Sequence, residues 1–217
     1  VPASWAACKT EVGSHGGHLS KIDRNSPTTV TFSLKAERPL SFLPGQYVNL
    51  NVPGSKETRS YSFSTAPDQD ELGFLIRDVP GGLMSTYMRS KASVGDFMGF
   101  TGPYGSFYLR PAVRPILMLA GGTGLAPFLS MLLWLKDNPT TQPIKLAYGV
   151  NTNDDLVELE ALDALKAAMP NFDYFTCVVD KESGHPRLGY VTDHLAQGDL
   201  NGGEADVYVC GPPPMVE

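Results

Sequence analysis

The chain has 217 residues, 42% of them hydrophobic and 18% charged, a composition typical of a globular protein with one large domain or two modest ones. Its formal net charge is −6 and it contains no Lys/Arg cluster, which argues against nucleic-acid binding. The long apolar run at 115–135 is interrupted by Gly, Thr, Pro and Ser. It therefore indicates strand, turn and helix, and no membrane span is expected.

Short strands separated by Pro, Gly, Asn or Asp dominate the first half of the chain. This regular spacing of short strands and turns predicts a six-stranded antiparallel β-barrel, with one helix at 83–92 that would cover the barrel mouth. The segment SHGGH, with His15 and His18, is expected to be a polar loop before the first strand, and no metal site is expected. The strands are predicted at 18–23, 28–36, 45–52, 58–65, 71–79 and 96–102.

From about Arg114 onward, apolar strands alternate with amphipathic helices. Strands joined by helical crossovers predict an α/β doubly wound parallel sheet with both faces covered. The expected domains are therefore a barrel at 1–112 and an α/β domain at 113–217. The α/β strands are predicted at 115–120, 143–150, 172–180 and 206–211, and the helices at 126–137 and 156–169.

The segment RSYSFSTAP (59–67) is an unusual strand, because neither side carries Val, Ile or Leu. Arg59, Tyr61 and Phe63 would share one face and serine hydroxyls the other, so neither face resembles a core. This composition predicts a ligand-binding surface, although Arg59 in a surface ion pair is an alternative. Further along, in GPYGSFYL, we expect core packing for Phe107 and structural roles for Gly102, Pro103 and Gly105.

Two glycine-rich segments resemble phosphate loops. In AGGTGLAPFLSML the glycines follow a strand end and a helix is expected to begin at about Pro127, so that the N-terminal N–H groups would face an anion. A tight turn without ligand is the weaker alternative, since three glycines in four residues exceed what a turn requires. The segment PGGLMS (80–85) repeats the pattern, and with Arg59 it would suit a pyrophosphate. At the end of the last strand, Cys210 and Gly211 occupy the carboxyl edge where open α/β sheets bind ligands.

Five motifs in order resemble those of the ferredoxin–NADP reductase superfamily. Among its members, the chain is most similar to the reductase components of bacterial benzoate, toluate or anthranilate 1,2-dioxygenases. The motifs are RSYS (59–62), GLMS (82–85), GPYGSF (102–107), GGTGLAP (121–127) and CGPPPM (210–215).

The resemblance implies an FAD-binding barrel, an NAD-binding α/β domain and hydride transfer from NADH to FAD. Arg59 would neutralise the FAD pyrophosphate, Tyr61 would stack on the isoalloxazine, and Ser62 would bond near flavin N5. Thr123 and Cys210 would lie close to the nicotinamide, so that Ser62, Thr123 and Cys210 form the catalytic set. The remaining cofactor contacts would come from Ile76, Arg77, Gly82, Leu83, Met84, Ser85, Gly121, Gly122, Gly124, Gly211 and Pro212.

The same resemblance implies redox partners. Electrons would pass singly to a ferredoxin-type [2Fe–2S] domain of the same full-length polypeptide and then to a terminal dioxygenase. This chain cannot hold that cluster itself, because Cys8, Cys177 and Cys210 are too few and too far apart. Residues 1–14 resemble the linker that follows such a domain, and the chain is expected to be incomplete after Glu217. The sparse cysteines favour a cytoplasmic location.

The loop GVNTNDDLVE (149–158) favours NADH over NADPH, because it offers Asn and Asp but no cation for a 2′-phosphate. A distant lysine could still supply one. Two alternatives remain for the function: a reductase module for another acceptor, of monooxygenase or flavohaemoglobin type, and a non-catalytic flavin-binding redox subunit. Benzoate, toluate and anthranilate systems are not distinguished.

Overall fold

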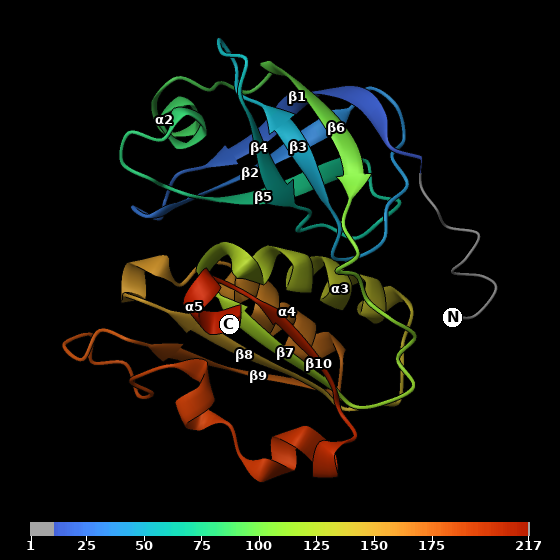
Figure 1. Ribbon diagram of the computed structural model, residues 1–217, viewed down its shortest axis with the longest axis vertical. Coiled ribbons are helices and arrows are strands. Elements are labelled where there is room, and N and C mark those ends of the chain that lie inside the picture. Colours follow the sequence, from blue (N-terminus) through green and yellow to red (C-terminus); the bar gives the residue numbers. More distant parts are fainter. Residues whose placement is uncertain (1–10, 217) are drawn as a thin grey trace. The chain divides into compact units, whose positions relative to one another are not determined.

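The computed structural model describes residues 11–216, so most of the expected linker at 1–14 lies outside the described part. The chain divides into two compact units, Val1–Leu109 and Arg110–Glu217. The division lies three residues before the expected boundary at 112. Each unit has its own sheet (Figure 1).

The first unit is a six-stranded sheet in the order β4-β3-β6-β1-β2-β5, with antiparallel pairs throughout. Just beyond β4, the Ser64 N–H donates to the Gly73 carbonyl of β5 at 2.8 Å, so the two edge strands nearly close the barrel. The predicted barrel is confirmed. Its strands are β1 (Gly13–Asp23), β2 (Thr29–Ala36), β3 (Tyr47–Asn51), β4 (Thr58–Ser62), β5 (Glu71–Arg77) and β6 (Phe97–Tyr104).

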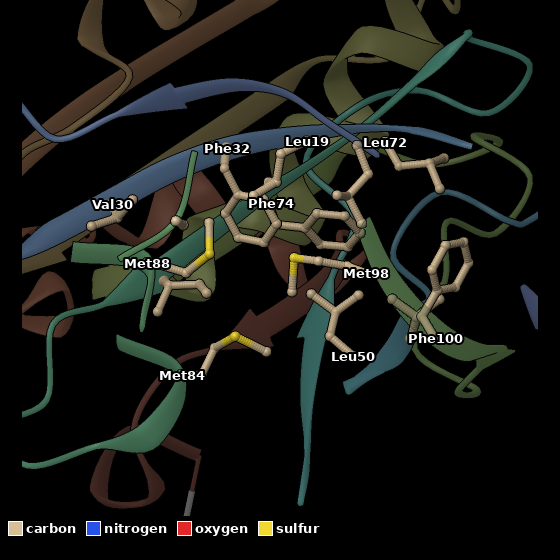
Figure 2. Packing of buried hydrophobic residues seen from close by; sticks show 14 of the residues in the cluster. Leu19, Val30, Phe32, Leu50, Leu72, Phe74, Met84, Met88, Met98 and Phe100 are labelled. Atoms are coloured by element: carbon tan, nitrogen blue, oxygen red, sulfur yellow. The ribbon is translucent and has the colours of Figure 1, made fainter. Parts of the chain in front are cut away.

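The barrel interior is filled by the inward side chains of its strands and by helix α2 (Leu83–Ser90). Met84 and Met88 of α2 are buried in the same cluster as Phe74 of β5 and Met98 of β6, as Figure 2 shows. The helix is therefore part of the barrel core.

The prediction of a polar loop at SHGGH is wrong, because these residues belong to β1 and pair with β6 from Gly13 to His18. The strand was not recognised because glycine is uncommon in strands. A Cβ at Gly16 would lie 2.6 Å from the Phe97 ring, and one at Gly17 would lie 2.9 Å from the Lys35 carbonyl oxygen. The Lys35 main chain thus requires glycine at position 17, where a strand normally shows β-branched residues. Gly13 and Ser14, included in the expected linker, are also strand residues.

The expectation that Phe63 belongs to a face unlike a core is also wrong. Phe63 is fully buried, and its ring stacks on Phe42 with centroids 3.8 Å apart. Phe107, in contrast, is only half-buried, and Leu109 is the fully buried side chain of that segment. A Cβ at Gly102 would lie 2.7 Å from Val48 Cγ1, which agrees with a structural role for this glycine.

The second unit contains a parallel four-stranded sheet in the order β10-β7-β8-β9, which confirms the predicted α/β domain. Because β7, β8 and β9 succeed one another across the sheet, right-handed crossovers place helices α3 and α4 on one face, where they contact each other. The elements are β7 (Ile116–Gly121), α3 (Ala126–Asp137), β8 (Ile144–Val150), α4 (Leu159–Ala168), β9 (Phe172–Val178), β10 (Asp206–Cys210) and α5 (Pro213–Val216).

The opposite face is covered by the crossover from β9 to β10, which forms the 3-10 turns η3 (Val191–His194) and η4 (Gln197–Gly203) instead of an α-helix. Val191 of η3 packs in a cluster with Ala147 and Cys177 of the sheet. In η4, Asp199 accepts a hydrogen bond from Lys145 of β8 at 2.5 Å. These contacts bury the second sheet face.

Helix α4 begins later than predicted. The expected helix covers 156–169, whereas α4 starts at Leu159 because Glu158 has a left-handed backbone with φ of 61°. The fully buried Tyr148 holds the preceding segment: its hydroxyl donates to the Asp155 carbonyl (3.0 Å) and accepts from the Val157 N–H (3.4 Å). This tertiary contact overrides the helical pattern.

Candidate cofactor-binding sites

Strand β4 carries the first residues expected to contact a flavin. The Arg59 guanidinium lies 3.1 Å from the Glu57 carboxylate and also donates to the Thr58 carbonyl oxygen. The surface ion pair considered as an alternative for Arg59 is therefore present. The side chain is nevertheless 46% exposed, so it is accessible to a phosphate.

Tyr61 and Ser62 follow on the same strand and are both half-buried. The Tyr61 ring packs against the barrel core on one side. Burial raises the pKa of Tyr61 to about 12, against the opposing influence of Arg59, so the phenol is neutral at physiological pH. Ser62 is the last residue of β4 and pairs with Tyr47 of β3. A neutral aromatic ring beside an accessible cation suits a flat anionic cofactor.

The PGG turn and helix α2 form the second part of this region. Gly81 has φ of +73°, and a Cβ at Gly82 would lie 2.7 Å from the Ser85 hydroxyl. The buried Ser85 hydroxyl donates to the Val79 carbonyl at 2.9 Å and so tightens the turn. Gly82 is the N-cap and provides no side-chain cap, which leaves the first N–H groups of α2 open to an external acceptor. An anion is the acceptor that a helix N-terminus favours.

Of the other residues expected around the flavin, some have exposed side chains and others have buried ones. Arg77 and Leu83 are exposed, whereas the side chains of Ile76 and Met84 lie in the barrel core. The expected contacts of Ile76 and Met84 are thus restricted to their main chains.

The segments from β4 and β5 meet at the gap in the barrel. The Ser64–Gly73 hydrogen bond continues the antiparallel order beyond β4, and residues of β4 and β5 contact each other. The PGG turn (80–82) follows β5 after Asp78 and Val79. The cation, the ring and the open helix N-terminus therefore belong to one region of the barrel.

In the second unit, the GGTG and CGP motifs lie against each other. A Cβ at Gly124 would collide with the Cys210 carbonyl oxygen, and a Cβ at Gly121 would lie 2.8 Å from Pro212 Cδ and 3.2 Å from the Gly211 Cα. Gly122 has φ of +55° in the 3-10 turn η1 (Gly122–Leu125), which leads into α3 at Ala126, with Pro127 in its first turn as predicted. All three glycines thus have structural reasons, so their number no longer argues for a ligand by itself.

The GGTG and CGP motifs nevertheless lie where ligands bind in parallel α/β sheets. Both follow parallel strands at their carboxyl ends, where β7 and β10 are neighbours. Thr123 and Cys210 are half-buried there, and Pro212 is exposed. Burial raises the pKa of the Cys210 thiol, which keeps the sulfur neutral at physiological pH. Cys210 suits contact with an uncharged ring better than nucleophilic chemistry.

The loop after β8 is held on several sides. Asp155 accepts hydrogen bonds from the Thr152 N–H and hydroxyl, and Asn153 donates to the Ser183 carbonyl oxygen. The Asp180 N–H also donates to the Asn151 carbonyl. The segment that contains Lys181 therefore runs beside a loop that has no cation of its own.

Two family models cover most of the chain. The oxidoreductase FAD-binding domain matches residues 17–108, and the oxidoreductase NAD-binding domain matches residues 118–217. The chain belongs to the FAD- and NAD-binding oxidoreductases. The first unit is its FAD-binding domain and the second its NAD-binding domain.

Relatives and solved structures support the resemblance to the ferredoxin–NADP reductase superfamily, which is confirmed. The toluate 1,2-dioxygenase electron transfer component of Pseudomonas putida is 49% identical over 219 residues, and the match covers 100% of this chain and 65% of the relative. The 2-halobenzoate 1,2-dioxygenase electron transfer component of Burkholderia cepacia is 50% identical over 224 residues, with the same coverage. The cytochrome P450 reductase GcoB of Amycolatopsis shares the fold, with a TM-score of 0.89 and 29% identity over 96% of this chain and 64% of that one. The chain thus spans about two thirds of the length of these relatives.

Within residues 11–216, the helices are too short or too polar to cross a bilayer. The same residues contain no group of three or more His, Cys, Asp or Glu side chains arranged to hold a metal ion.

Three residues near these sites carry no signal in the sequence. Asp78 and Arg89 form an ion pair across helix α2, and Tyr148 fixes the loop after β8. Asp78 and Arg89 come together because both bond to the connection between β1 and β2 (24–28), which is distant in the sequence. Tyr148 lies in an apolar strand and resembles an ordinary core residue. The residue types alone therefore do not reveal these roles.

Proposed function

We propose that the chain is the flavin and nicotinamide module of an electron transfer component that serves a ring-hydroxylating aromatic-acid dioxygenase. It would take hydride from NADH and pass electrons singly to a ferredoxin-type [2Fe–2S] domain of the same full-length polypeptide. The 49–50% identity to two dioxygenase electron transfer components, over the whole of this chain, is the observation that carries the proposal. We also propose a cytoplasmic location, in keeping with the sparse cysteines.

The barrel residues fit an FAD molecule. Arg59 would bind the pyrophosphate together with the open N–H groups of α2, at Leu83 to Ser85, because both present hydrogen-bond donors to an anion. Tyr61 would stack on the isoalloxazine, and Ser62 would donate a hydrogen bond near N5. Bound FAD would supply the redox chemistry, since a flavin accepts a hydride and releases electrons one at a time.

The α/β residues would orient the nicotinamide. Gly121, Gly122 and Gly124 allow the main chain close to the dinucleotide, while Thr123 and Cys210 would border the ring, with Gly211 and Pro212 beside it. A neutral Cys210 thiol places no charge beside the ring. Hydride transfer needs near contact and alignment of the two rings, so the contribution of these residues is positional.

The decisive experiment is an anaerobic titration of the purified chain with NADH. We expect the yellow oxidised flavin spectrum to bleach, because a hydride donor reduces the flavin. A chain that binds FAD but keeps its oxidised spectrum would be a non-catalytic flavin-binding subunit. Repetition with NADPH tests the nicotinamide choice: comparable catalytic efficiency with both would contradict the preference for NADH. In that event Lys181→Gln should reduce the use of NADPH if Lys181 supplies the missing cation.

A reductase module for another acceptor is the second candidate. The propane 2-monooxygenase reductase component of Mycolicibacterium goodii is 37% identical over 206 residues, which favours this alternative over a non-catalytic role. The two candidates differ in the protein that is reduced. Turnover of benzoate, toluate or anthranilate by a matching dioxygenase, driven by the full-length polypeptide and NADH, would support the first candidate, and failure with all three would favour the second.

A further inference from the structure

Two guanidinium groups attach the C-terminal end of helix α2 to the barrel. Arg24 donates to the carbonyl oxygens of Met88 (2.8 Å) and Ala92 (2.6 Å). Arg89 lies in the last turn of α2, and its Nε donates to Asp78 Oδ2 at 2.8 Å. The two side chains are only 25% and 27% exposed, so the ion pair is partly shielded from water. The other guanidinium nitrogens of Arg89 donate to carbonyl oxygens of the β1–β2 connection, at Arg24 (3.1 Å), Ser26 (3.0 Å) and Pro27 (3.2 Å).

Asp78 connects this anchor to the PGG turn. Its own N–H donates to the Thr28 carbonyl at 2.7 Å, so the same β1–β2 connection holds both members of the pair. The next residue, Val79, accepts hydrogen bonds from the Gly82 N–H (2.8 Å) and the Ser85 hydroxyl (2.9 Å). A continuous series of contacts therefore runs from Arg89 through Asp78 to the residues that begin the helix.

The direction of α2 depends on these contacts. Met84 and Met88 anchor the helix by apolar packing, which has no strong directional preference. Charge-assisted hydrogen bonds are directional, and the planar guanidinium orients its partners. Arg24 holds the same end of α2 through carbonyl oxygens, whereas the ion pair joins the end of the helix to the residue just before the turn. The pair therefore constrains the direction in which the first N–H groups of α2 point.

We propose that the Asp78–Arg89 ion pair is the positioning device of the FAD pyrophosphate site. It rests on the proposed function, in which the N-terminus of α2 receives the pyrophosphate. Neither residue contacts the cofactor in this proposal. Each acts through the orientation of the main-chain donors at Leu83 to Ser85, so loss of the pair affects the phosphate end of the cofactor and leaves the ring end intact.

The test compares the affinity of the flavin-free chain for FAD with its affinity for riboflavin, which has the ring but no phosphate. We expect Asp78→Ala to weaken FAD binding by about tenfold, the effect of one charge-assisted hydrogen bond, and to leave riboflavin binding unchanged. Asp78→Glu restores a carboxylate and should recover most of the affinity. Arg89→Lys, which keeps the charge but loses the fork, should resemble Asp78→Ala.

Arg38→Gln is the matched control, because it removes an exposed cation from a loop at the far end of β2. It should change neither affinity. Equal weakening of FAD and riboflavin by Asp78→Ala would indicate general loosening of the barrel and overturn the inference, as would an unchanged FAD affinity. A wild-type chain that bound no FAD would overturn the proposed function as well.

Discussion

Gly124 lies so close to the carbonyl group of Cys210 that no side chain fits between them. We expect Gly124→Ala to destabilise the NAD-binding domain by an amount at the upper end of about 1–3 kcal/mol, because the main chain of Cys210 must move. The same movement would displace Thr123 and Cys210 and should weaken NADH binding. Urea unfolding and NADH titration measure the two effects.

Gly198→Ala is the control for this substitution. Gly198 also lies in the second unit, in η4, but a Cβ there would meet nothing within 4 Å. Its unfolding free energy should stay within about 0.5 kcal/mol of the wild type. A Gly124→Ala variant as stable as Gly198→Ala would show that the two motifs are not in tight contact.

Arg59 and Ser62 should separate binding of FAD from its reduction. Because the Arg59–Glu57 pair is half-exposed, Arg59→Ala should change the unfolding free energy by less than about 1 kcal/mol. FAD retention should nevertheless fall by about tenfold or more, since a donor to the pyrophosphate is lost. Ser62→Ala should retain FAD better than Arg59→Ala and mainly slow flavin reduction by NADH. Flavin release and stopped-flow reduction provide the comparison, and the reverse ranking would refute both roles.

The thiols of the second unit should react slowly in the folded chain. Burial raises the pKa of Cys177 to about 11 and also raises that of Cys210. In a Cys8→Ser background, alkylation at neutral pH should therefore be slow, and it should accelerate strongly in urea. Rapid alkylation of the folded chain at Cys210 would contradict a neutral, half-buried thiol.

The same shift of Cys177 predicts alkaline sensitivity. The folded pKa is raised, so the unfolded chain loses its proton first. The stabilising contribution is therefore complete below the ordinary thiol pKa of about 8.5 and is lost as the pH rises toward about 11. Unfolding free energies should fall across this range, and less steeply in Cys177→Ala than in the wild type.

Tyr148 should affect the affinity for NADH more than turnover. Its hydroxyl holds the Asp155 carbonyl at 3.0 Å, and Tyr148→Phe keeps the buried ring but releases this part of the loop. We expect the KM for NADH to rise by about three- to tenfold with little change in kcat, the cost of one buried hydrogen bond. Tyr174→Phe is the control, because the Tyr174 hydroxyl bonds the exposed Asp163. An equal change in KM for both variants would refute a specific role for Tyr148.

Elements with a regular pattern were predictable. Helix α3 begins and ends at the predicted residues, and each predicted strand exists. These elements are predictable because burial of one face or of both faces produces a regular pattern of apolar residues along the chain. The family was also recognisable from its ordered motifs, and the FAD-binding and NAD-binding domain models confirm it. Features that depend on consecutive residues can therefore be read from the sequence.

Elements that depend on distant neighbours were missed. The SHGGH strand has a glycine at position 17 because the Lys35 main chain lies against it, and α4 starts late because Tyr148 holds the segment before it. Phe63 lies in the core because Phe42 and Phe74 surround it. None of these neighbours is adjacent in the sequence.

The amino-acid sequence by itself determined the two folds, the order of the motifs and the family, because those depend on local pattern and residue type. Only the tertiary structure decided why Gly121 and Gly124 must be glycines and how α2 is oriented. Gly124, in the turn after β7, meets Cys210 at the end of β10, and Arg89 meets the β1–β2 connection more than sixty positions away in the chain. Such contacts form only when folding brings distant segments together, so no local pattern records them.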